Sequence, residues 1–398
     1  MEQQQAPPVT ERATCRLCGA GELGNVLSLG DLYVSTFVKK PGEGIRAPLE
    51  LVLCTKCELL QLRHTAPQEI LYSRHYWYRS GINQVIINDL KEIAEQVHSM
   101  ANLRTGDVFL DIGANDGTLL GFVPEGVVRV GCEPADNLVE ELRKRADHVI
   151  HDFWNAGAYQ KLGLPPAKVI TAIGMFYDME DPNQFIRDAA MVMDDNGIFI
   201  SQLMCLAPMI KQNDVGNVCH EHLEFYSYKT LKFLFEKNGL EIFRVEENAI
   251  NGGSYRLFAR KLRAGSIDYP EPSYDYGAFA RRIEENRKKT VEFIKREVAK
   301  GKRVWAYGAS TKGNTILQYY GLDCTLIEAA ADRSPEKWGK YTVGTMIPIV
   351  SEEEARKSRP DYFFVLPYAF LDAFMEREKE WHEKGGRFIV SIPEFRVV

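Results

Sequence analysis

Four cysteines in two Cys-x2-Cys pairs stand near the start of the chain and constrain its fold more than any other feature. The pairs are Cys15 with Cys18 and Cys54 with Cys57. Two thiolates separated by two residues can bind one tetrahedral Zn²⁺, and a second pair completes a closed site. Because a closed site leaves no position for a substrate, we expect a structural zinc ion. The alternative is four ordinary buried cysteines.

The composition is that of an ordinary globular protein, with 45% hydrophobic and 26% charged residues among 398. This length leaves room for two or three domains. A net charge of −6 argues against a nucleic-acid partner, although paired Cys-x2-Cys modules often occur in nucleic-acid ribbons. The sequence contains neither a long apolar run nor the basic and apolar regions of a secretion signal. We therefore expect a cytoplasmic protein with no membrane segment, and its scattered remaining cysteines suit that compartment.

Strands and helices alternate through the middle of the chain, which predicts a doubly wound parallel sheet with ligands at the carboxyl ends of its strands. A long charged helix at 278–302 then leads to a second α/β unit. Strands are predicted at 107–113, 128–133, 168–173, 197–203, 241–245, 254–259, 303–308, 325–330, 362–366 and 387–391. Helices of the middle part are predicted at 82–100, 135–146, 180–193 and 228–238.

The predicted fold class is therefore α/β, in three units. Residues 1–75 form the zinc-binding module, and residues 76–265 form a cofactor-binding doubly wound sheet. Residues 266–398 comprise the long helix and a Rossmann-like domain. The sequence leaves the oligomeric state open, and a monomer is compatible with it.

A glycine-rich turn follows the first strand of the middle unit. It reads Asp111-Ile-Gly113-x3-Gly117, and its small residues let the backbone approach a ligand closely. Glu133 ends the second strand, 20 residues after Gly113, where a carboxylate can accept from both ribose hydroxyls. A structural turn or an NAD site would look similar, although the spacing is not Gly-x-Gly-x2-Gly.

This turn resembles the signature of class I S-adenosylmethionine (SAM) methyltransferases, in which the acid before the glycine lies near the methionine end of the cofactor. In such enzymes the segment after the third strand holds the adenine, and here it contains Asp152 and Phe153. The resemblance implies a set of cofactor-binding residues: Asp111, Gly113, Asn115, Asp116, Gly117, Glu133, Asp152 and Phe153.

A second cluster, from Cys219 to Ser227, brings several ionisable side chains together. His222 can act as a base near neutral pH, and Glu221 can orient it or contact a substrate. Structural hydrogen bonding and metal binding by His220 and His222 are the alternatives. The spacing is not His-Glu-x2-His, which excludes a zinc protease.

Two further glycine-rich loops are candidate substrate contacts. The loop Asn251-Gly-Gly-Ser-x-Arg256 enters a late strand and reads equally well as a plain hairpin turn. The loop Gly308 to Thr315 has Asn314 where a phosphate-binding P-loop requires lysine, so an NTPase is improbable. Backbone N–H groups at its helix start still suit an anion, with Lys312 beside them.

Together, in this order, these motifs resemble the sugar C-methyltransferases of deoxysugar biosynthesis across essentially the whole chain. The resemblance adds the aromatic segment Tyr76-Trp-Tyr78-x-Ser-Gly to the motifs above. It implies SAM and structural zinc as cofactors, and a nucleotide-diphosphate sugar as substrate. The activity it implies is C-methylation of a nucleotide-linked 4-keto-6-deoxy sugar, most directly at C3, through an enolate.

The roles implied for single residues follow from that chemistry. His222 is the expected base, Glu221 its partner, and Tyr76 or Tyr78 binds the sugar or the enolate oxygen. The expected substrate-binding residues are Asn217, His220, Tyr177, Gly253, Ser254, Arg256, Ser310, Lys312 and Asn314.

This chain departs from the family at two places. Cys219 stands where one member of the family, the 3-C-methyltransferase of tetronitrose assembly, has a tyrosine. Met175-Phe-Tyr177 stands where that enzyme has a segment that contains a histidine. Tyr177 could restore a hydroxyl. The departures bear on the details of the active site, on the sugar and on the methylated carbon. Two other functions stay open: O-methylation, in which His222 deprotonates a hydroxyl, and a zinc-ribbon nucleic-acid-binding protein.

Overall fold

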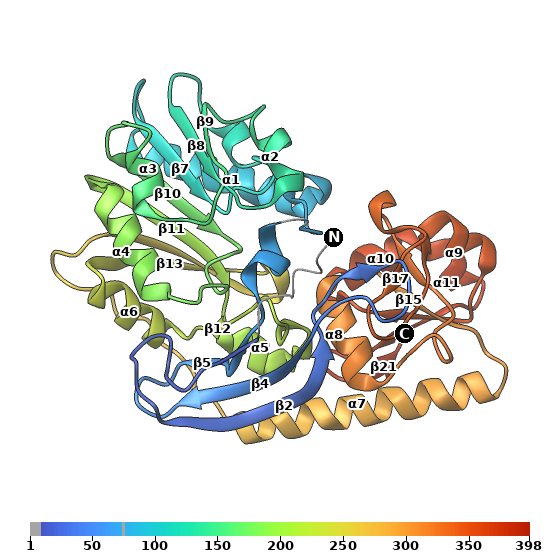
Figure 1. Cartoon of the computed structure of the whole chain (residues 1–398). Coiled ribbons are helices and arrows are strands. Elements are labelled where there is room, and N and C mark those ends of the chain that lie inside the picture. The colour runs from blue at the N-terminus through green and yellow to red at the C-terminus, as the bar shows by residue number, and fades with distance from the viewer. Residues whose placement is uncertain (1–8, 74–75) are drawn as a thin grey trace, which may run out of the picture.

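The computed structural model describes residues 9–73 and 76–398, and within them three sheets of four or more strands lie side by side (Figure 1). A four-stranded sheet carries the cysteine pairs, a seven-stranded sheet forms the middle of the chain, and a six-stranded sheet forms the C-terminal part. The predicted α/β class with an N-terminal four-cysteine module is confirmed. The boundaries at 75/76 and 265/266 stay predictions.

The four-stranded sheet has the order β12-β5-β4-β2 and is antiparallel throughout. Its strands β2 and β4 are long, at 11 and 9 residues. Its edge strand β12 comes from a distant part of the chain, directly after His222, so the cysteine-bearing module is paired with the segment of the predicted base. The strands are β2 (Leu23–Tyr33), β4 (Arg46–Cys54), β5 (Leu60–Leu62) and β12 (Glu224–Phe225).

The seven-stranded sheet has the order β13-β14-β11-β10-β7-β8-β9. The five strands from β11 to β9 are parallel, and β14 and β13 join antiparallel. The carboxyl ends of β7, β8 and β10 therefore meet at one edge. The strands are β7 (Val108–Ile112), β8 (Val128–Cys132), β9 (His148–Ile150), β10 (Ala167–Ile173), β11 (Met193–Met204), β13 (Leu240–Asn248) and β14 (Ser254–Lys261).

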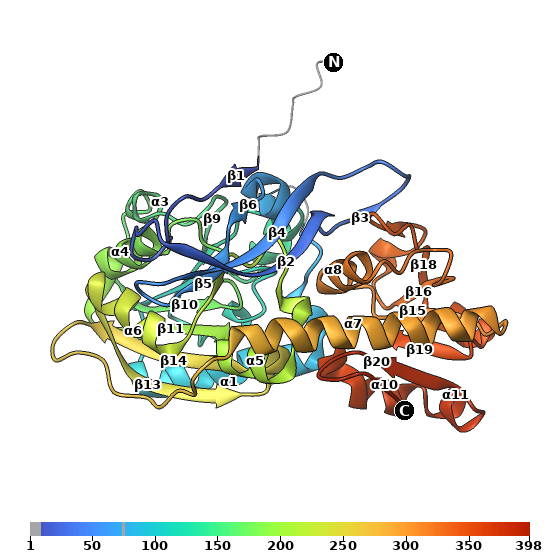
Figure 2. The same cartoon turned by 90° about the horizontal axis from the view of Figure 1, so that it is seen from below.

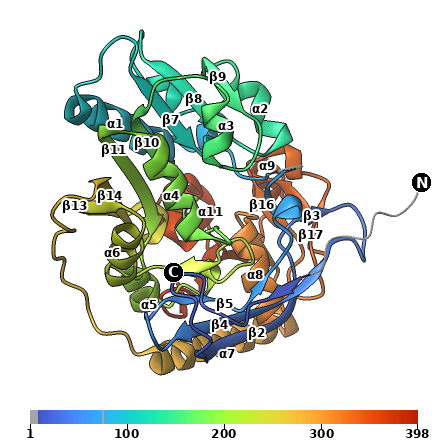
Figure 3. The ribbon, with the colours of Figure 1, turned by 60° about the vertical axis from the view of Figure 1, so that its left-hand side comes forward.

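Helices cover both faces of this sheet, as Figure 3 shows. Helix α1 packs on one face through Ile86, Leu90 and Ile93, whereas α4 and α6 pack on the other. The middle strands are buried on both faces, which explains why their sequences are almost continuously apolar. The helices are α1 (Gln84–Ala101), α2 (Asp136–Leu142), α3 (Ala156–Gln160), α4 (Pro182–Val192) and α6 (Tyr228–Lys237).

The six-stranded sheet follows helix α7 (Tyr276–Ala299) and has the order β18-β16-β15-β19-β20-β21. Its first five strands are parallel. Helix α8 (Thr311–Tyr320) follows β15, and α9 (Glu352–Ser358), α10 (Leu371–Arg377) and α11 (Lys379–Glu383) complete the layers. The strands are β15 (Val304–Tyr307), β16 (Ala330–Asp332), β18 (Ile349–Ser351), β19 (Tyr362–Val365), β20 (Arg387–Val390) and β21 (Arg396–Val397).

The strand predicted at 325–330 is wrong. The carboxylate of Asp323 accepts hydrogen bonds from the backbone N–H and the hydroxyl of Thr325, at 2.9 and 2.6 Å. This local turn occupies the start of the predicted strand, and β16 begins only at Ala330. The turn at Asp323 thus prevents the β-branched, apolar residues after it from forming a strand.

The N-terminal and C-terminal parts share one hydrophobic core. Phe37 and Leu49 of the cysteine-bearing module, Leu206 and Phe225 of the middle part and Ile316 of α8 belong to the same buried cluster. Strand β3 (Phe37–Val38) also pairs with β17 (Tyr341–Thr342). Figure 2 shows α7 extending from α5 (Leu206–Gln212) to the six-stranded sheet.

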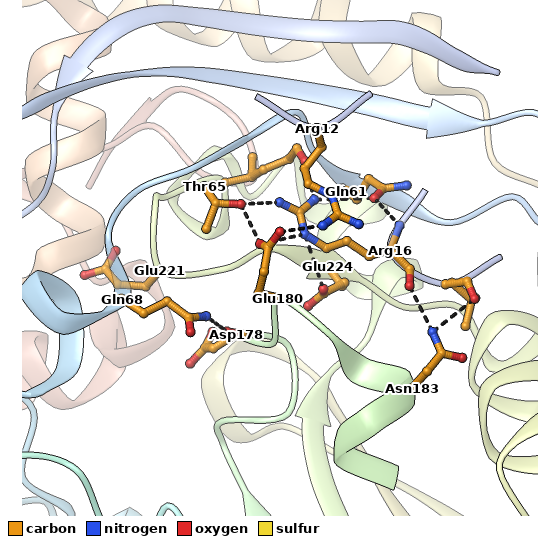
Figure 4. A network of polar contacts seen from close by, with 12 residues as sticks. Arg12, Arg16, Gln61, Thr65, Gln68, Asp178, Glu180, Asn183, Glu221 and Glu224 are labelled. Carbon is orange, nitrogen blue, oxygen red and sulfur yellow. Dashed lines mark hydrogen bonds and ion pairs between the residues drawn. The ribbon is translucent and has the colours of Figure 1, made fainter. Parts of the chain in front are cut away.

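Arg16, in the first cysteine pair, fixes the cysteine-bearing module to the seven-stranded sheet (Figure 4). Its guanidinium is fully buried and donates to the hydroxyl of Thr65 at 2.7 Å, to the Leu62 carbonyl and to Glu180 at 3.3 Å. Glu224 of β12 lies 3.8 Å away, with both carboxylate oxygens buried and without a hydrogen bond. One buried positive charge therefore lies among hydrogen-bond acceptors and carboxylates from three segments of the chain.

We predict that Arg16→Met lowers the free energy of unfolding by about 3–5 kcal/mol, because it leaves buried acceptors without their cation. Arg12→Met is the matched control: Arg12 also contacts Glu180, at 2.7 Å, but its side chain is 26% exposed. An exposed pair of this kind contributes at most about 1 kcal/mol. Denaturant unfolding of the two variants checks this, and equal losses would contradict it.

Candidate active site

The four cysteines of the N-terminal module form one cluster, with all four Sγ atoms within 4.8 Å of one another. Each pair closes the same turn: the N–H of Gly19 donates to the Cys15 carbonyl, and the N–H of Glu58 donates to the Cys54 carbonyl. Gly19 and Glu58 both take positive φ, at 77° and 65°. Four converging sulfur donors of this kind fit a tetrahedral zinc ion.

A cavity of about 290 Å³ lies at the carboxyl ends of β7, β8 and β10. Glu133 lines it, directly after β8, and its carboxylate accepts from the backbone N–H groups of Asn115 and Ala135, both at 2.9 Å. Burial raises the pKa of Glu133 to about 7. Each carboxylate oxygen retains a second lone pair, so Glu133 can still accept from a ligand's hydroxyls.

Four of the eight predicted cofactor residues line this cavity: Gly113, Asn115, Glu133 and Phe153. Gly113 has a φ of 72°, and a Cβ there would lie 2.7 Å from the side chain of Met175. The backbone must therefore be free of a side chain where it approaches the cavity, which fits close contact with a bound molecule.

The other four predicted cofactor residues are not among those that line this cavity. Asp111 is buried and accepts from the Thr171 hydroxyl at 2.7 Å, and burial raises its pKa to about 7. Asp116 accepts from the N–H of Gly81 at 2.9 Å, while Gly117 packs against α2. Asp152 accepts from the N–H of the next residue. Cofactor binding by these four stays a prediction.

A second cavity, of about 140 Å³, adjoins the first. Both are lined by Tyr76, Tyr78, Ser80, Ile173 and Gly174. The two predicted catalytic tyrosines thus stand between the cavities. The two cavities therefore meet at these five residues.

His222 lines the second cavity with a defined protonation pattern. Its Nδ1 lies 2.9 Å from the carbonyl oxygen of Asn217. A carbonyl can only accept, so Nδ1 carries the hydrogen and Nε2 of the neutral ring is free to take a proton. Burial, assisted by the charge of Lys312, holds the pKa of His222 well below its usual value. The ring therefore stays neutral at physiological pH.

Tyr177 packs edge-on against this imidazole, with 4.6 Å between ring centroids, and also lines the cavity. Its hydroxyl donates to the Gly174 carbonyl at 2.8 Å. Burial raises the pKa of Tyr177 well above its usual value, so the phenol stays protonated.

The other two members of the His-Glu-His segment face elsewhere. Glu221 does not line either cavity: its backbone carbonyl accepts from the Tyr72 hydroxyl at 2.7 Å, and its buried Oε2 has no hydrogen-bond partner. Burial raises its pKa. Figure 4 places it near Gln68 and Asp178. His220 contacts the carbonyl of Ala47 in the cysteine-bearing module at 3.0 Å.

The glycine-rich segment from Gly308 to Thr315 reaches the second cavity through Thr311 and Lys312, in the first turn of α8. The other two predicted substrate residues of this segment hold the fold. Ser310 caps α8 by accepting from the N–H of Gly313 at 3.0 Å, and Asn314 donates to the Thr36 carbonyl at 2.9 Å. A role for Ser310 or Asn314 in substrate binding stays a prediction.

The glycine-rich loop before β14 also reaches this cavity, through Ser254. Gly253 has a φ of 125° and packs against Pro208, where a Cβ would lie 2.6 Å from the ring. Arg256 is buried and forms ion pairs with Asp89 and Glu92, both at 2.8 Å. These ion pairs join β14 to α1, so the structure gives Arg256 a role in packing, and substrate binding by it stays a prediction.

Sequence reasoning did not single out Asp178, which lines the first cavity. Its buried Oδ1 has no hydrogen-bond partner, and burial raises its pKa well above the usual value. The signal was its position in the segment after a parallel strand, β10, where α/β proteins place ligand contacts. Nothing else in the sequence marks it.

Sequence models of three protein families match the chain. They describe a zinc binding domain over residues 15–72, a methyltransferase domain over 85–245 and a C-methyltransferase C-terminal domain over 249–393. C-methyltransferase NovU of Streptomyces niveus is 30% identical over 407 aligned positions, which cover 96% of each chain.

The chain belongs to this C-methyltransferase family. The resemblance to the sugar C-methyltransferases, drawn from motifs alone, is confirmed. The protein is a SAM-dependent methyltransferase with a four-cysteine zinc domain. The lining of the first cavity, with Glu133 after β8, fits SAM, and binding there stays a prediction.

Solved structures show weaker similarity. Magnesium protoporphyrin IX methyltransferase (ChlM) of Synechocystis PCC 6803, with bound S-adenosylhomocysteine, is 14% identical; the match covers 46% of this chain and 89% of ChlM, with a TM-score of 0.36. Mitomycin 7-O-methyltransferase MmcR is 17% identical over 45% of this chain and 54% of MmcR, with a TM-score of 0.36. In the part of the chain that the structure describes, no helix has the length and apolar character to cross a membrane.

We predict one zinc ion per chain, and its loss in Cys54→Ser together with a melting temperature lowered by at least ~5 °C, because a structural zinc site contributes folding energy directly. Cys324→Ser is the control, since Cys324 is exposed and outside the cluster. Metal analysis and thermal unfolding measure both effects. Freshly purified protein without zinc would refute the prediction.

We predict that SAM affinity rises with pH and levels off above about 7, because Glu133 must lose its proton to accept fully from the ribose hydroxyls. Below that pKa, affinity should fall by up to about tenfold per pH unit. Glu133→Gln should abolish this dependence and weaken binding at pH 8 by about 1.5–3 kcal/mol. Calorimetry from pH 6 to 8 measures both, and a flat wild-type profile would assign the ribose to another acid.

Proposed function

We propose that the protein transfers a methyl group from SAM to carbon in a nucleotide-linked 4-keto-6-deoxy sugar, at C3, through an enolate. The observation that carries this proposal is the neutral imidazole of His222, with Nε2 free, in a cavity that shares a wall with the cofactor cavity. The match to a C-methyltransferase over 96% of the chain supports transfer to carbon.

A ketone acidifies the C–H bonds beside it, so a modest base can remove a proton there. Nε2 of His222 takes the proton, Nδ1 remains bonded to the Asn217 carbonyl, and the negative charge moves to the ketone oxygen. A base positioned in this way contributes roughly 10²–10⁴-fold to rate. When bound, SAM supplies an electrophilic methyl group.

Tyr76 and Tyr78 stand between the two cavities and bind the sugar, and Tyr177 fixes the edge of the imidazole. Glu221 lies outside both cavities, so its proposed role is to hold the segment that carries His222. The C-terminal unit faces the substrate through Thr311 and Lys312, which is consistent with a nucleotide sugar held between units. We also propose the three-unit division of the chain and a cytoplasmic location.

Mass spectrometry of TDP-, GDP- and CDP-linked 4-keto sugars incubated with SAM tests the activity. Deuterium exchange from solvent, measured without SAM, locates the acidic carbon. Exchange at C3 together with a methyl group on that carbon supports the proposal. A methylated hydroxyl with no exchange would instead establish O-methylation, in which His222 deprotonates an alcohol.

We predict that His222→Asn loses both deuterium exchange and methyl transfer by 10²-fold or more, while it binds SAM with wild-type affinity. Glu221→Gln should slow both steps less, because its carboxyl lies outside the cavity. Exchange that persists at the wild-type rate in His222→Asn would move the base to Tyr76, Tyr78 or Tyr177.

A further inference from the structure

Lys312 brings a positive charge from the C-terminal unit into the second cavity. It lies in the first turn of α8, and its Nζ contacts the side-chain oxygen of Asn217 at 2.5 Å and the sulfur of Met204 at 3.0 Å. An ammonium has three N–H donors, and these contacts use two. Because Lys312 lines the cavity, the third donor is available to a ligand there.

Asn217 holds this lysine and the predicted base together. Its backbone carbonyl accepts from Nδ1 of His222, and its side-chain oxygen accepts from Nζ of Lys312. Both contacts involve one residue of the short helix η4 (Val215–Asn217), which is buried. The separation between base and cation is therefore fixed before any substrate binds.

The charges around the cavity make Lys312 distinctive. Among the described residues that line it, Asp89 is the other charged side chain, and its carboxylate is paired with Arg256 at 2.8 Å. Burial lowers the pKa of His222 and raises the pKa of the acids Asp214 and Glu221, and the positive charge of Lys312 acts downward on all three. The positive charge of Lys312 thus disfavours protonation of His222 unless a negative charge forms between the two side chains.

We propose that Lys312 is a catalytic residue that donates a hydrogen bond to the ketone oxygen of the substrate and stabilises the enolate. This inference rests on the proposed function. In the step it assists, the C–H bond beside the ketone breaks and its proton goes to Nε2 of His222. The electron pair forms a C=C bond, and the carbonyl π pair moves to the oxygen that faces Lys312. Charge balance is kept, because one imidazolium and one enolate form together.

The sequence alone suggested an anion at the start of this helix, with Lys312 beside it, and the structure favours the ketone as the group that Lys312 contacts. A diphosphate carries more charge than one lysine neutralises, and no second cation lines this cavity among the described residues. Asn217 ties Lys312 to the base, which is where the ketone has to lie for proton transfer. A donor placed in advance at a developing oxyanion typically contributes 10²–10³-fold to kcat.

The test compares Lys312→Met with Lys211→Met, a control at an exposed lysine of α5. Deuterium exchange into the keto sugar is measured without SAM, and the affinity for TDP, GDP and CDP is measured by calorimetry. We expect Lys312→Met to slow exchange by 10²–10³-fold and to leave the affinity for the preferred nucleoside diphosphate within twofold. Lys211→Met should change neither.

Each outcome decides one question. Weaker diphosphate binding with exchange intact would overturn the inference and return Lys312 to phosphate binding. Wild-type exchange in a folded Lys312→Met, with unchanged nucleotide affinity, would overturn it as well. A wild-type enzyme that exchanges no deuterium with any keto sugar would refute the proposed function itself. Lys312→Arg, which keeps the charge, should recover part of the exchange and separates loss of the cation from misfolding.

Discussion

The burial of Arg16 is the interaction on which the arrangement of the active site depends. A guanidinium removed from water is costly unless hydrogen-bond acceptors surround it, and here they come from the cysteine-bearing module and from the segment after β10. That segment includes Glu180, which lines the first cavity, and Glu224 lies two residues after His222. Arg16 itself lies between Cys15 and Cys18 of the four-cysteine cluster, so one short loop contacts both the segment after β10 and the segment that follows His222.

The proposed reactive groups come from two of the three predicted units. The middle unit supplies the aromatic segment around Tyr76 and also His222, and the C-terminal unit supplies Lys312. Asn217 connects the last two through separate atoms. Such a site is assembled by tertiary packing, because none of its parts is near another in sequence, and its precision depends on the shared core that surrounds it.

Local patterns predicted the elements of the two parallel sheets well, because continuous apolar strands and amphipathic helices have distinctive periods. They also predicted Gly113, Glu133 and His222 at cavity walls. The contacts that the sequence did not reveal share one cause. Strand β12, the ion pairs of Arg256 and the contact of Asn314 with Thr36 all join residues far apart in sequence, and no local pattern encodes such a pairing. The turn at Asp323 is the exception. Its Asp-x-Thr pattern is local and visible in the sequence, where it competes with the apolar stretch that predicts a strand.

The core that joins the two ends of the chain also has a consequence during synthesis. Phe37 and Leu49 emerge early from the ribosome, yet Ile316, Phe364 and Ile389 in the same cluster emerge last. At roughly 5–20 residues per second, these early apolar side chains wait on the order of tens of seconds for their partners. The nascent chain therefore carries an exposed apolar surface for most of its translation, and it depends on protection from aggregation until the last strands arrive.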